Sequence, residues 1–344
     1  MSHTLCRSML VAGAIAILPL GTARSAESVA QVPAVRLLEV PAETRGGKAP
    51  VISTVTVSRQ GDRMAAVGDD HLVRIWSMPD GQLLHRLMGH EDWVRVATFR
   101  PDGKLLATSG DDRQILLWDV QTGRPQARLQ QSQVIYTMAF STDGSRLAAA
   151  GFDDKVQVYD AQKNRVLFDL VAPGARIEAL AFSPDGVQLA AAGRTGAVRL
   201  WSSVDGKSLR DLESKRGVRA LAYSPDGKLL AVGGDARVVS LFDPSTGMLV
   251  KTLPDRPAKT RALVFCGQGY LAAGGSDNLI RLWDLATGVE KSHLVGHTGS
   301  ISSLSWDESS SLLVSGSFDT TVRLWQWTGE PAQRLSRRPA TPGN

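Results

Sequence analysis

The chain alternates hydrophobic and polar residues in short runs, and each run ends near a large aromatic residue. Two of these runs are LVRIWS at residues 72–77 and QILLWDV at residues 114–120. Alternation with β-branched residues is typical of strands that bury one face. The aromatic residues follow one another at intervals of 41 or 42 residues, at Trp76, Trp118, Tyr159, Trp201, Phe242, Trp283 and Trp325. Such a period indicates a repeat architecture.

Turn sequences recur in step with the aromatic residues. A first turn precedes an apolar strand in four units, as RPDG at 100–103, STDG at 141–144 and SPDG at 183–186 and 224–227. A second turn follows each aromatic residue and contains glycine, or in the third unit Asn164. Proline presets the first turn position, and glycine or asparagine accepts a positive φ at the end. Each unit therefore holds four short antiparallel strands, and seven units predict an all-β, seven-bladed β-propeller.

These features resemble the WD-repeat family, in which each unit has Gly-His near its start and Trp-Asp near its end. Here Gly-His stands at 89–90 and 296–297, and Trp-Asp stands at 118–119 and 283–284. The resemblance covers roughly residues 35–335. It implies one propeller domain over residues 34–336. The SPDG turns and the compact plan without further domains look bacterial.

A propeller must close its ring, because an open sheet edge invites aggregation. In the WD-repeat family the outermost strand of the last blade usually comes from the N-terminus. Residues 34–40 match the pattern of residues 82–90, and residues 330–336 could fill the same place from the C-terminus. We expect the N-terminal strand to close the ring, and residues 337–344 to form a disordered tail.

Residues 1–26 have the pattern of a signal peptide. Arg7 precedes the apolar run 9–20, and small residues at 21–26 allow cleavage after Ala23 or Ser25. The apolar run is shorter than the roughly 20 residues that cross a bilayer, and Pro19 interrupts it. We therefore expect an exported protein, periplasmic or extracellular, with no membrane span in its mature chain.

Charge and cysteine content narrow the classes of function. The formal charge is +5 and would be +3 without Arg7 and Arg24, which is a weaker basic bias than nucleic-acid binders show. Of the two cysteines, Cys6 lies in the predicted signal, so Cys266 has no intramolecular partner. A small apolar filler in a β core is the usual role of such a cysteine.

Histidine, serine and aspartate recur with the spacing of the repeat. His297 is followed by Ser315, Asp319 and Trp325, and His90 is followed at the same offsets by Thr108, Asp112 and Trp118. A hydrolytic triad needs one site with an oxyanion hole, whereas this set occurs on two separate blades. The WD-repeat resemblance implies that both tetrads are buried structural networks of hydrogen bonds.

The sequence shows no other catalytic or cofactor signature. It lacks a nucleophile elbow, a zinc helix, a Cys-x-x-Cys pair and a phosphate-binding loop. His293 and His297 have the spacing of a helical metal pair, but the repeat places them on a strand end and a loop. We therefore expect no catalytic residues, no metal and no cofactor.

Function is then expected on the rims of the propeller, where loops and the channel mouth can dock a protein or peptide. The family resemblance places eight residues on the top face, with an exposed Trp93 as the most distinctive: Trp93, Arg95, Tyr136, Arg176, Glu178, Arg219, Lys259 and Arg261. Five of the eight are cationic, which predicts an acidic partner surface. The alternative is an enzyme or small-ligand binder that uses the central channel, which would need converging carboxylates or histidines there.

Overall fold

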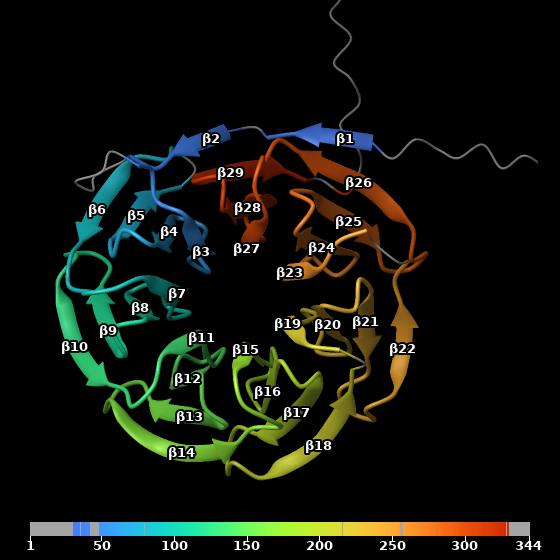
Figure 1. The fold of residues 1–344 in the computed structure, drawn as a ribbon, viewed down its shortest axis with the longest axis horizontal. Coiled ribbons are helices and arrows are strands. Elements are labelled where there is room, and N and C mark those ends of the chain that lie inside the picture. Colours follow the sequence, from blue (N-terminus) through green and yellow to red (C-terminus); the bar gives the residue numbers. More distant parts are fainter. Residues whose placement is uncertain are drawn as a thin grey trace, which may run out of the picture.

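The strands surround a central axis as seven radial sheets in the described part of the chain (Figure 1). The structure is a computed structural model that describes residues 30–34, 36–41, 48–78, 80–214, 216–254, 257–327 and 329. In each sheet consecutive strands run antiparallel, from the channel to the outer rim. The prediction of a seven-bladed, all-β propeller is confirmed.

We number the blades in chain order. Blade 1 contains β3 (Ile52–Val57), β4 (Arg63–Gly68), β5 (Val73–Ser77) and β6 (Leu83–Leu87). Blade 2 contains β7 (Val94–Phe99), β8 (Leu105–Gly110), β9 (Gln114–Asp119) and β10 (Pro125–Gln130). Blade 3 contains β11 (Ile135–Phe140), β12 (Arg146–Gly151), β13 (Lys155–Asp160) and β14 (Arg165–Val171). Blade 4 contains β15 (Ile177–Phe182), β16 (Gln188–Gly193), β17 (Ala197–Ser202) and β18 (Ser208–Glu213).

The remaining blades continue this order. Blade 5 contains β19 (Val218–Tyr223), β20 (Leu230–Gly234), β21 (Val239–Phe242) and β22 (Leu249–Thr252). Blade 6 contains β23 (Thr260–Cys266), β24 (Tyr270–Gly275), β25 (Ile280–Asp284) and β26 (Glu290–Val295). Blade 7 contains β27 (Ile301–Asp307), β28 (Leu312–Ser317) and β29 (Thr321–Gln326).

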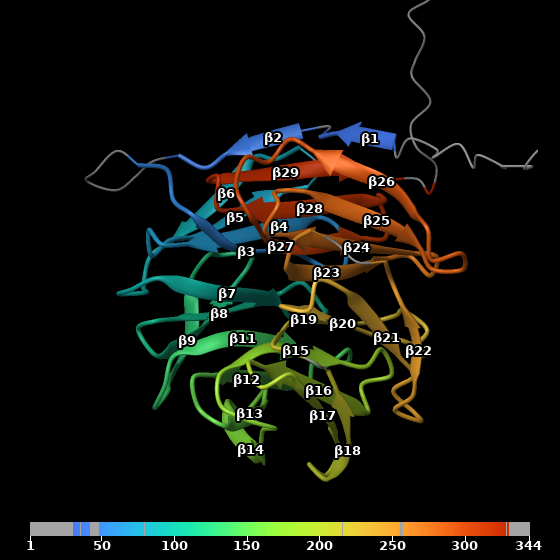
Figure 2. The ribbon, with the colours of Figure 1, turned by 45° about the vertical axis from the view of Figure 1, so that its right-hand side comes forward.

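The N-terminal segment closes the ring, as the sequence predicts. Strand β2 (Arg36–Glu39) pairs antiparallel with β29 and completes blade 7. Strand β1 (Ala30–Pro33) continues along the outside and pairs in parallel with β26. Blade 6 therefore has five strands instead of the predicted four, because the chain that enters β2 also covers the outer edge of its neighbour (Figure 2). Residues 330–344 and the predicted signal lie outside the described residues.

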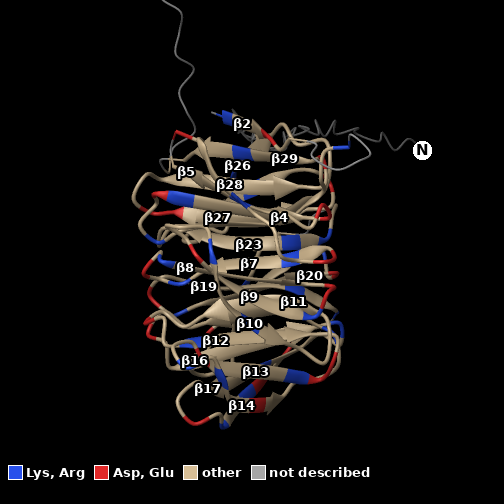
Figure 3. Cartoon of the chain, turned by 90° about the vertical axis from the view of Figure 1, so that its left-hand side faces the viewer, with Lys and Arg blue, Asp and Glu red and all other residues tan. Residues whose placement is uncertain are grey.

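The hydrophobic core lies between neighbouring blades. Each of its clusters combines apolar side chains from two adjacent sheets, as in the cluster that joins Val73 and Ile75 of blade 1 with Leu106 and Trp118 of blade 2. Trp118, Trp283 and Trp325 are among the largest fully buried side chains. In the side view, charged positions gather toward the loops of the two faces, and the strand bodies are largely uncharged (Figure 3). No helix in the described residues is long and apolar enough for a membrane span.

Every innermost strand has a β-bulge near its start, at the end of the strand that borders the central channel. In β7, Val94 pairs with Gly110 and Val96 with Ser109, so Arg95 lies opposite no residue of β8. The same shift occurs in β3, β11, β15, β19, β23 and β27. Gly110 permits this close approach, because a Cβ there would lie 2.0 Å from the carbonyl oxygen of Trp93. Bulges of this kind redirect a side chain, here toward the channel.

Candidate functional site at the channel mouth

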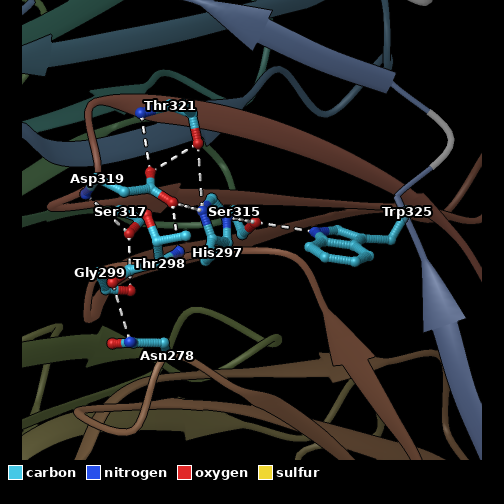
Figure 4. Close-up of polar contacts among 9 residues, drawn as sticks. All are labelled: Asn278, His297, Thr298, Gly299, Ser315, Ser317, Asp319, Thr321 and Trp325. Atoms are coloured by element: carbon cyan, nitrogen blue, oxygen red, sulfur yellow. Dashed lines mark hydrogen bonds and ion pairs between the residues drawn. The ribbon is translucent and has the colours of Figure 1, made fainter.

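The serine-containing tetrad is a continuous chain of buried hydrogen bonds in blade 7 (Figure 4). The Trp325 indole Nε1 donates to Ser315 Oγ at 2.8 Å, and Ser315 Oγ lies 2.7 Å from His297 Nε2. His297 Nδ1 lies 2.8 Å from Asp319 Oδ2, so the imidazole bridges hydroxyl and carboxylate. The backbone N–H of Thr298 also donates to Asp319 Oδ2, at 2.9 Å. The network ties strands β28 and β29 to a turn and to the loop that enters the blade.

The threonine-containing tetrad in blade 2 repeats this geometry. Trp118 Nε1 donates to Thr108 Oγ1 at 2.7 Å, and Thr108 Oγ1 lies 2.8 Å from His90 Nε2. His90 Nδ1 lies 2.6 Å from Asp112 Oδ2. Both Thr108 and Ser315 are fully buried, and each hydroxyl is bonded to a tryptophan and a histidine. These hydroxyls lie inside the sheets, where they hold neighbouring segments together.

Hydrogen bonding keeps the two tetrad carboxylates ionised. Burial opposes ionisation, but hydrogen bonds from His297 and Thr321 outweigh it and lower the pKa of Asp319 well below its ordinary value. For Asp112, the hydrogen bond and charge of His90 likewise outweigh burial and lower the pKa. At neutral pH each aspartate is therefore a charged acceptor for its histidine and for a backbone N–H.

Buried arginines replace the tetrad in two other blades, which the sequence reasoning missed. In blade 1, Arg74 Nη2 lies 2.6 Å from Asp70 Oδ2, and both side chains are 2% exposed. In blade 6, Arg281 Nη1 lies 2.5 Å from Asp277 Oδ2. The sequence contains a pattern that could have identified these pairs, because each arginine follows the turn aspartate of its blade by four residues. His293, considered above with His297, instead pairs with Glu290.

The seven bulge residues meet around one cavity of about 450 Å³ at the top of the channel, which we call the channel mouth. They come one from each blade: Ser53, Arg95, Tyr136, Glu178, Arg219, Arg261 and Ser302. Trp93 and Arg176 also line it, so seven of the eight predicted top-face residues share this cavity. The eighth, Lys259, lies beside it on the path into β23.

An alternating chain of charges runs along one side of the channel mouth. Glu178 accepts hydrogen bonds from Arg176 Nε and Arg219 Nη1, each at 2.9 Å. Arg219 Nε continues the chain to Asp235 Oδ1 at 2.9 Å, and Lys259 Nζ lies 3.3 Å from the same oxygen. In the described lining of the channel Glu178 is the one carboxylate, and it is already shared by two arginines.

Trp93 is less exposed than the sequence predicts, and both its indole N–H and its ring face have partners. Its indole Nε1 donates to Ser53 Oγ at 2.6 Å, and the Arg95 guanidinium stacks 3.6 Å from the ring centre. Arg95 in turn forms two hydrogen bonds with Asp111, at 2.8 and 2.5 Å. The expectation of a freely exposed Trp93 is wrong, because the ring is half-buried between a serine and a stacked arginine.

Arg261 differs from the other cations of the channel mouth. Its guanidinium lies 4.8 Å from the ring centre of Phe318, and within the described residues no carboxylate pairs with it. Burial, together with the nearby Arg219 charge, lowers the pKa of Arg261, although Glu178 and Asp235 oppose the shift. The channel mouth therefore contains a half-buried positive charge that an incoming anion would stabilise.

Two exposed phenylalanines complete the rim and were not predicted. Phe152 is 47% exposed and Phe318 is 37% exposed, and each directly precedes the turn aspartate of its blade. The ring centres of Phe152 and Tyr136 are 5.4 Å apart, and Arg176 lies over both rings. An aromatic residue at this turn position was the signal that could have identified them.

Comparison with known proteins agrees with this architecture. A family model described as the IFT122 first beta-propeller matches residues 51–326. Nuclear distribution protein PAC1 of Coprinopsis cinerea is 39% identical over 46 residues, which is 13% of this chain and 11% of that protein. PAC1 of Mycosarcoma maydis is 41% identical over 49 residues, or 14% and 11% of the two chains. The matched segments thus span about a tenth of these relatives.

Proposed function

Since the chain belongs to the WD-repeat propeller family described as the IFT122 first beta-propeller, we propose that it is a non-catalytic scaffold that binds an acidic segment of a partner protein. The binding site is the channel mouth, and Arg261 is the observation that carries the proposal. It is half-buried and stacked on Phe318, and no carboxylate pairs with it in the described structure. Arginine and aromatic residues are the usual anchors of protein interfaces.

The charges around Arg261 support an acidic partner. Five cationic side chains, those of Arg95, Arg176, Arg219, Lys259 and Arg261, lie at or beside the channel mouth, and three carboxylates offset them. These ion pairs hold the arginines in fixed orientations, so a partner would meet a preorganised surface. An aspartate or glutamate side chain inserted beside Arg261 would complete the pairing.

Substitution of Arg261 tests this site. We expect Arg261→Met, which keeps an apolar stem over Phe318, to weaken binding of acidic peptides about tenfold or more. The measurement is the affinity of the purified protein for acidic, neutral and basic peptides of equal length. Arg165→Met on the outer strand β14 is the matched control and should bind as the wild type does. Equal affinity for all three peptide classes, or unchanged binding by Arg261→Met, would contradict the proposal.

The proposal also places the protein outside the cytoplasm, in the periplasm or the extracellular space. The sequence of residues 1–26 supports this location. When the protein is expressed in its own cells, we expect mass spectrometry of the exported fraction to find an N-terminus at Arg24 or Ala26. Recovery of the full-length chain in the cytoplasmic fraction alone would sink this part of the proposal.

A further inference from the structure

Blades 6 and 7 depart from the repeat at the face opposite the channel mouth, where the loops join the first and second strands. Residues 267–269 link β23 to β24, whereas the longer segment 183–187 links β15 to β16. The shortened link consists of Gly267, Gln268 and Gly269 and lacks the Pro-Asp that the corresponding turns of blades 2, 4 and 5 contain. A Cβ built on Gly269 would meet nothing within 4 Å, so the shortened link leaves open space beside it.

Blade 7 lines that space with enlarged aromatic residues. Trp306 stands at the end of β27, where the other innermost strands carry Val57, Phe99, Phe140, Phe182, Tyr223 and Phe265. Trp327 stands two residues after the aromatic anchor, where the other blades carry Met78, Val120, Ala161, Ser203, Pro244 and Leu285. Together with Tyr270 and Glu308 they surround a cavity of about 260 Å³, which we call the aromatic recess.

The rings of the aromatic recess form adjoining walls. Tyr270 and Trp327 meet edge to face, with ring centres 5.5 Å apart and an interplanar angle of 84°. The Tyr270 hydroxyl donates to the carbonyl oxygen of Gly329 at 2.8 Å, which fixes its orientation. Trp327 is 3% exposed, and within the described residues its indole N–H has no hydrogen-bond partner. Trp327 belongs to a buried core cluster, and its unpartnered donor costs free energy that the packing of the ring has to offset.

Glu308 is the one charged side chain among the described residues that line the aromatic recess. Its Oε2 accepts a hydrogen bond from Trp306 Nε1 at 2.6 Å, so a neutral donor holds the carboxylate in place. Glu308 also acts on Cys266 in the wall of the recess. Burial raises the pKa of the Cys266 thiol, and the negative charge of Glu308 raises it further. The recess thus combines aromatic faces with an anion that forms no ion pair with any described residue.

From this geometry we infer that the aromatic recess binds a compact organic cation with a trimethylammonium head. Aromatic faces attract such a cation through their quadrupoles, and quaternary ammonium ligands are recognised by aromatic cages. The cavity is slightly smaller than the roughly 300–1,000 Å³ of drug-sized ligand sites, which suits a small head group. Choline and a trimethylated lysine side chain both carry this head. This site is separate from the channel mouth and does not depend on the function proposed there.

Calorimetric titration of the full chain tests the inference with four probes. These are tetramethylammonium, choline, a peptide with one trimethyllysine, and the neutral choline analogue in which carbon replaces the ammonium nitrogen. We expect the cationic probes that fit to bind about tenfold more tightly than the neutral analogue. Binding of choline would indicate a free small molecule as ligand, and binding of the peptide alone would indicate a modified protein side chain. Absence of binding by every cationic probe, or equal binding of the neutral analogue, would overturn the inference.

Two substitutions locate the binding. Trp306→Leu should weaken binding of the cation about tenfold, and Glu308→Gln should weaken it roughly threefold or more while leaving the neutral analogue unaffected. Glu308 is exposed, so Glu308→Gln preserves the fold even if Trp306→Leu does not. Glu213→Gln on β18 makes the same chemical change at an exposed site on another blade and is the matched control. Cation affinity unchanged in folded Glu308→Gln and Trp306→Leu proteins would place any binding elsewhere.

Discussion

Replacement of Trp118 by alanine is expected to destabilise the protein by about 3–5 kcal/mol, the usual cost of removing a buried large aromatic side chain. Trp118 is 1% exposed and lies in the core between blades 1 and 2. Its loss would leave a cavity in the core cluster that also contains Val73, Ile75 and Leu106 from the two neighbouring sheets. It would also leave Thr108 without the indole donor.

Thr108→Ala is the comparison that separates the anchor from the hydrogen-bond network. It leaves the indole N–H of Trp118 and Nε2 of His90 without their shared partner, which costs about 1–3 kcal/mol. Chemical denaturation of both variants measures the difference. A larger loss for Thr108→Ala than for Trp118→Ala would show that the network, and not aromatic burial, dominates the stability of the blade.

Substitution of Asp70 is expected to cost about 3–5 kcal/mol, because it strands the charge of Arg74 inside blade 1. Arg74 is 1% exposed, and its Nη2 lies 2.6 Å from the carboxylate. Among the described residues, Arg74 Nη2 also donates a longer hydrogen bond, of 3.4 Å, to the carbonyl oxygen of Pro41. Asp70→Ala therefore removes the main compensation for a guanidinium that water cannot reach.

The double variant Asp70→Ala/Arg74→Met tests that explanation. Replacing both partners removes the stranded charge and keeps most of the apolar stem, so much of the lost stability should return. Urea denaturation of the single and double variants forms the thermodynamic cycle. If the double variant were less stable than Asp70→Ala alone, the cost would lie in lost packing and not in an unpaired charge.

The sequence predicts the propeller well because its determinants are local and repeated. Each aromatic anchor, alternating strand and glycine turn is readable within one unit of 41 or 42 residues. The closing strand was also predicted, since residues 34–40 contain the pairing segment Arg36–Glu39. Strand β1 was not, because its four residues pair with β26 through the backbone, and backbone pairing leaves no side-chain signature.

The sequence predicted which residues belong to the candidate site, but it did not predict which of their side chains pair with each other. The repeat placed Arg95, Glu178 and Arg219 on the top face, and the structure brings them to one cavity. Their pairing depends on where each bulge directs a side chain and on carboxylates such as Asp235 from another loop. The Glu178–Arg219 and Asp235–Lys259 pairs join different blades, so spacing within one unit carries no information about them. The Arg95–Asp111 and Arg219–Asp235 pairs lie within one blade each and share a spacing of 16 residues.

Ring closure has a consequence for synthesis of the chain. Arg36 pairs with Leu324, and Ala30 pairs with Ser292, so these N-terminal residues meet their partners only after the segments that form blades 6 and 7 have been synthesised. Until β29 has been made, β2 has no strand to pair with, and the propeller ring stays open. Contacts between such distant positions form slowly. A nascent chain therefore cannot close its ring until its last blade is complete.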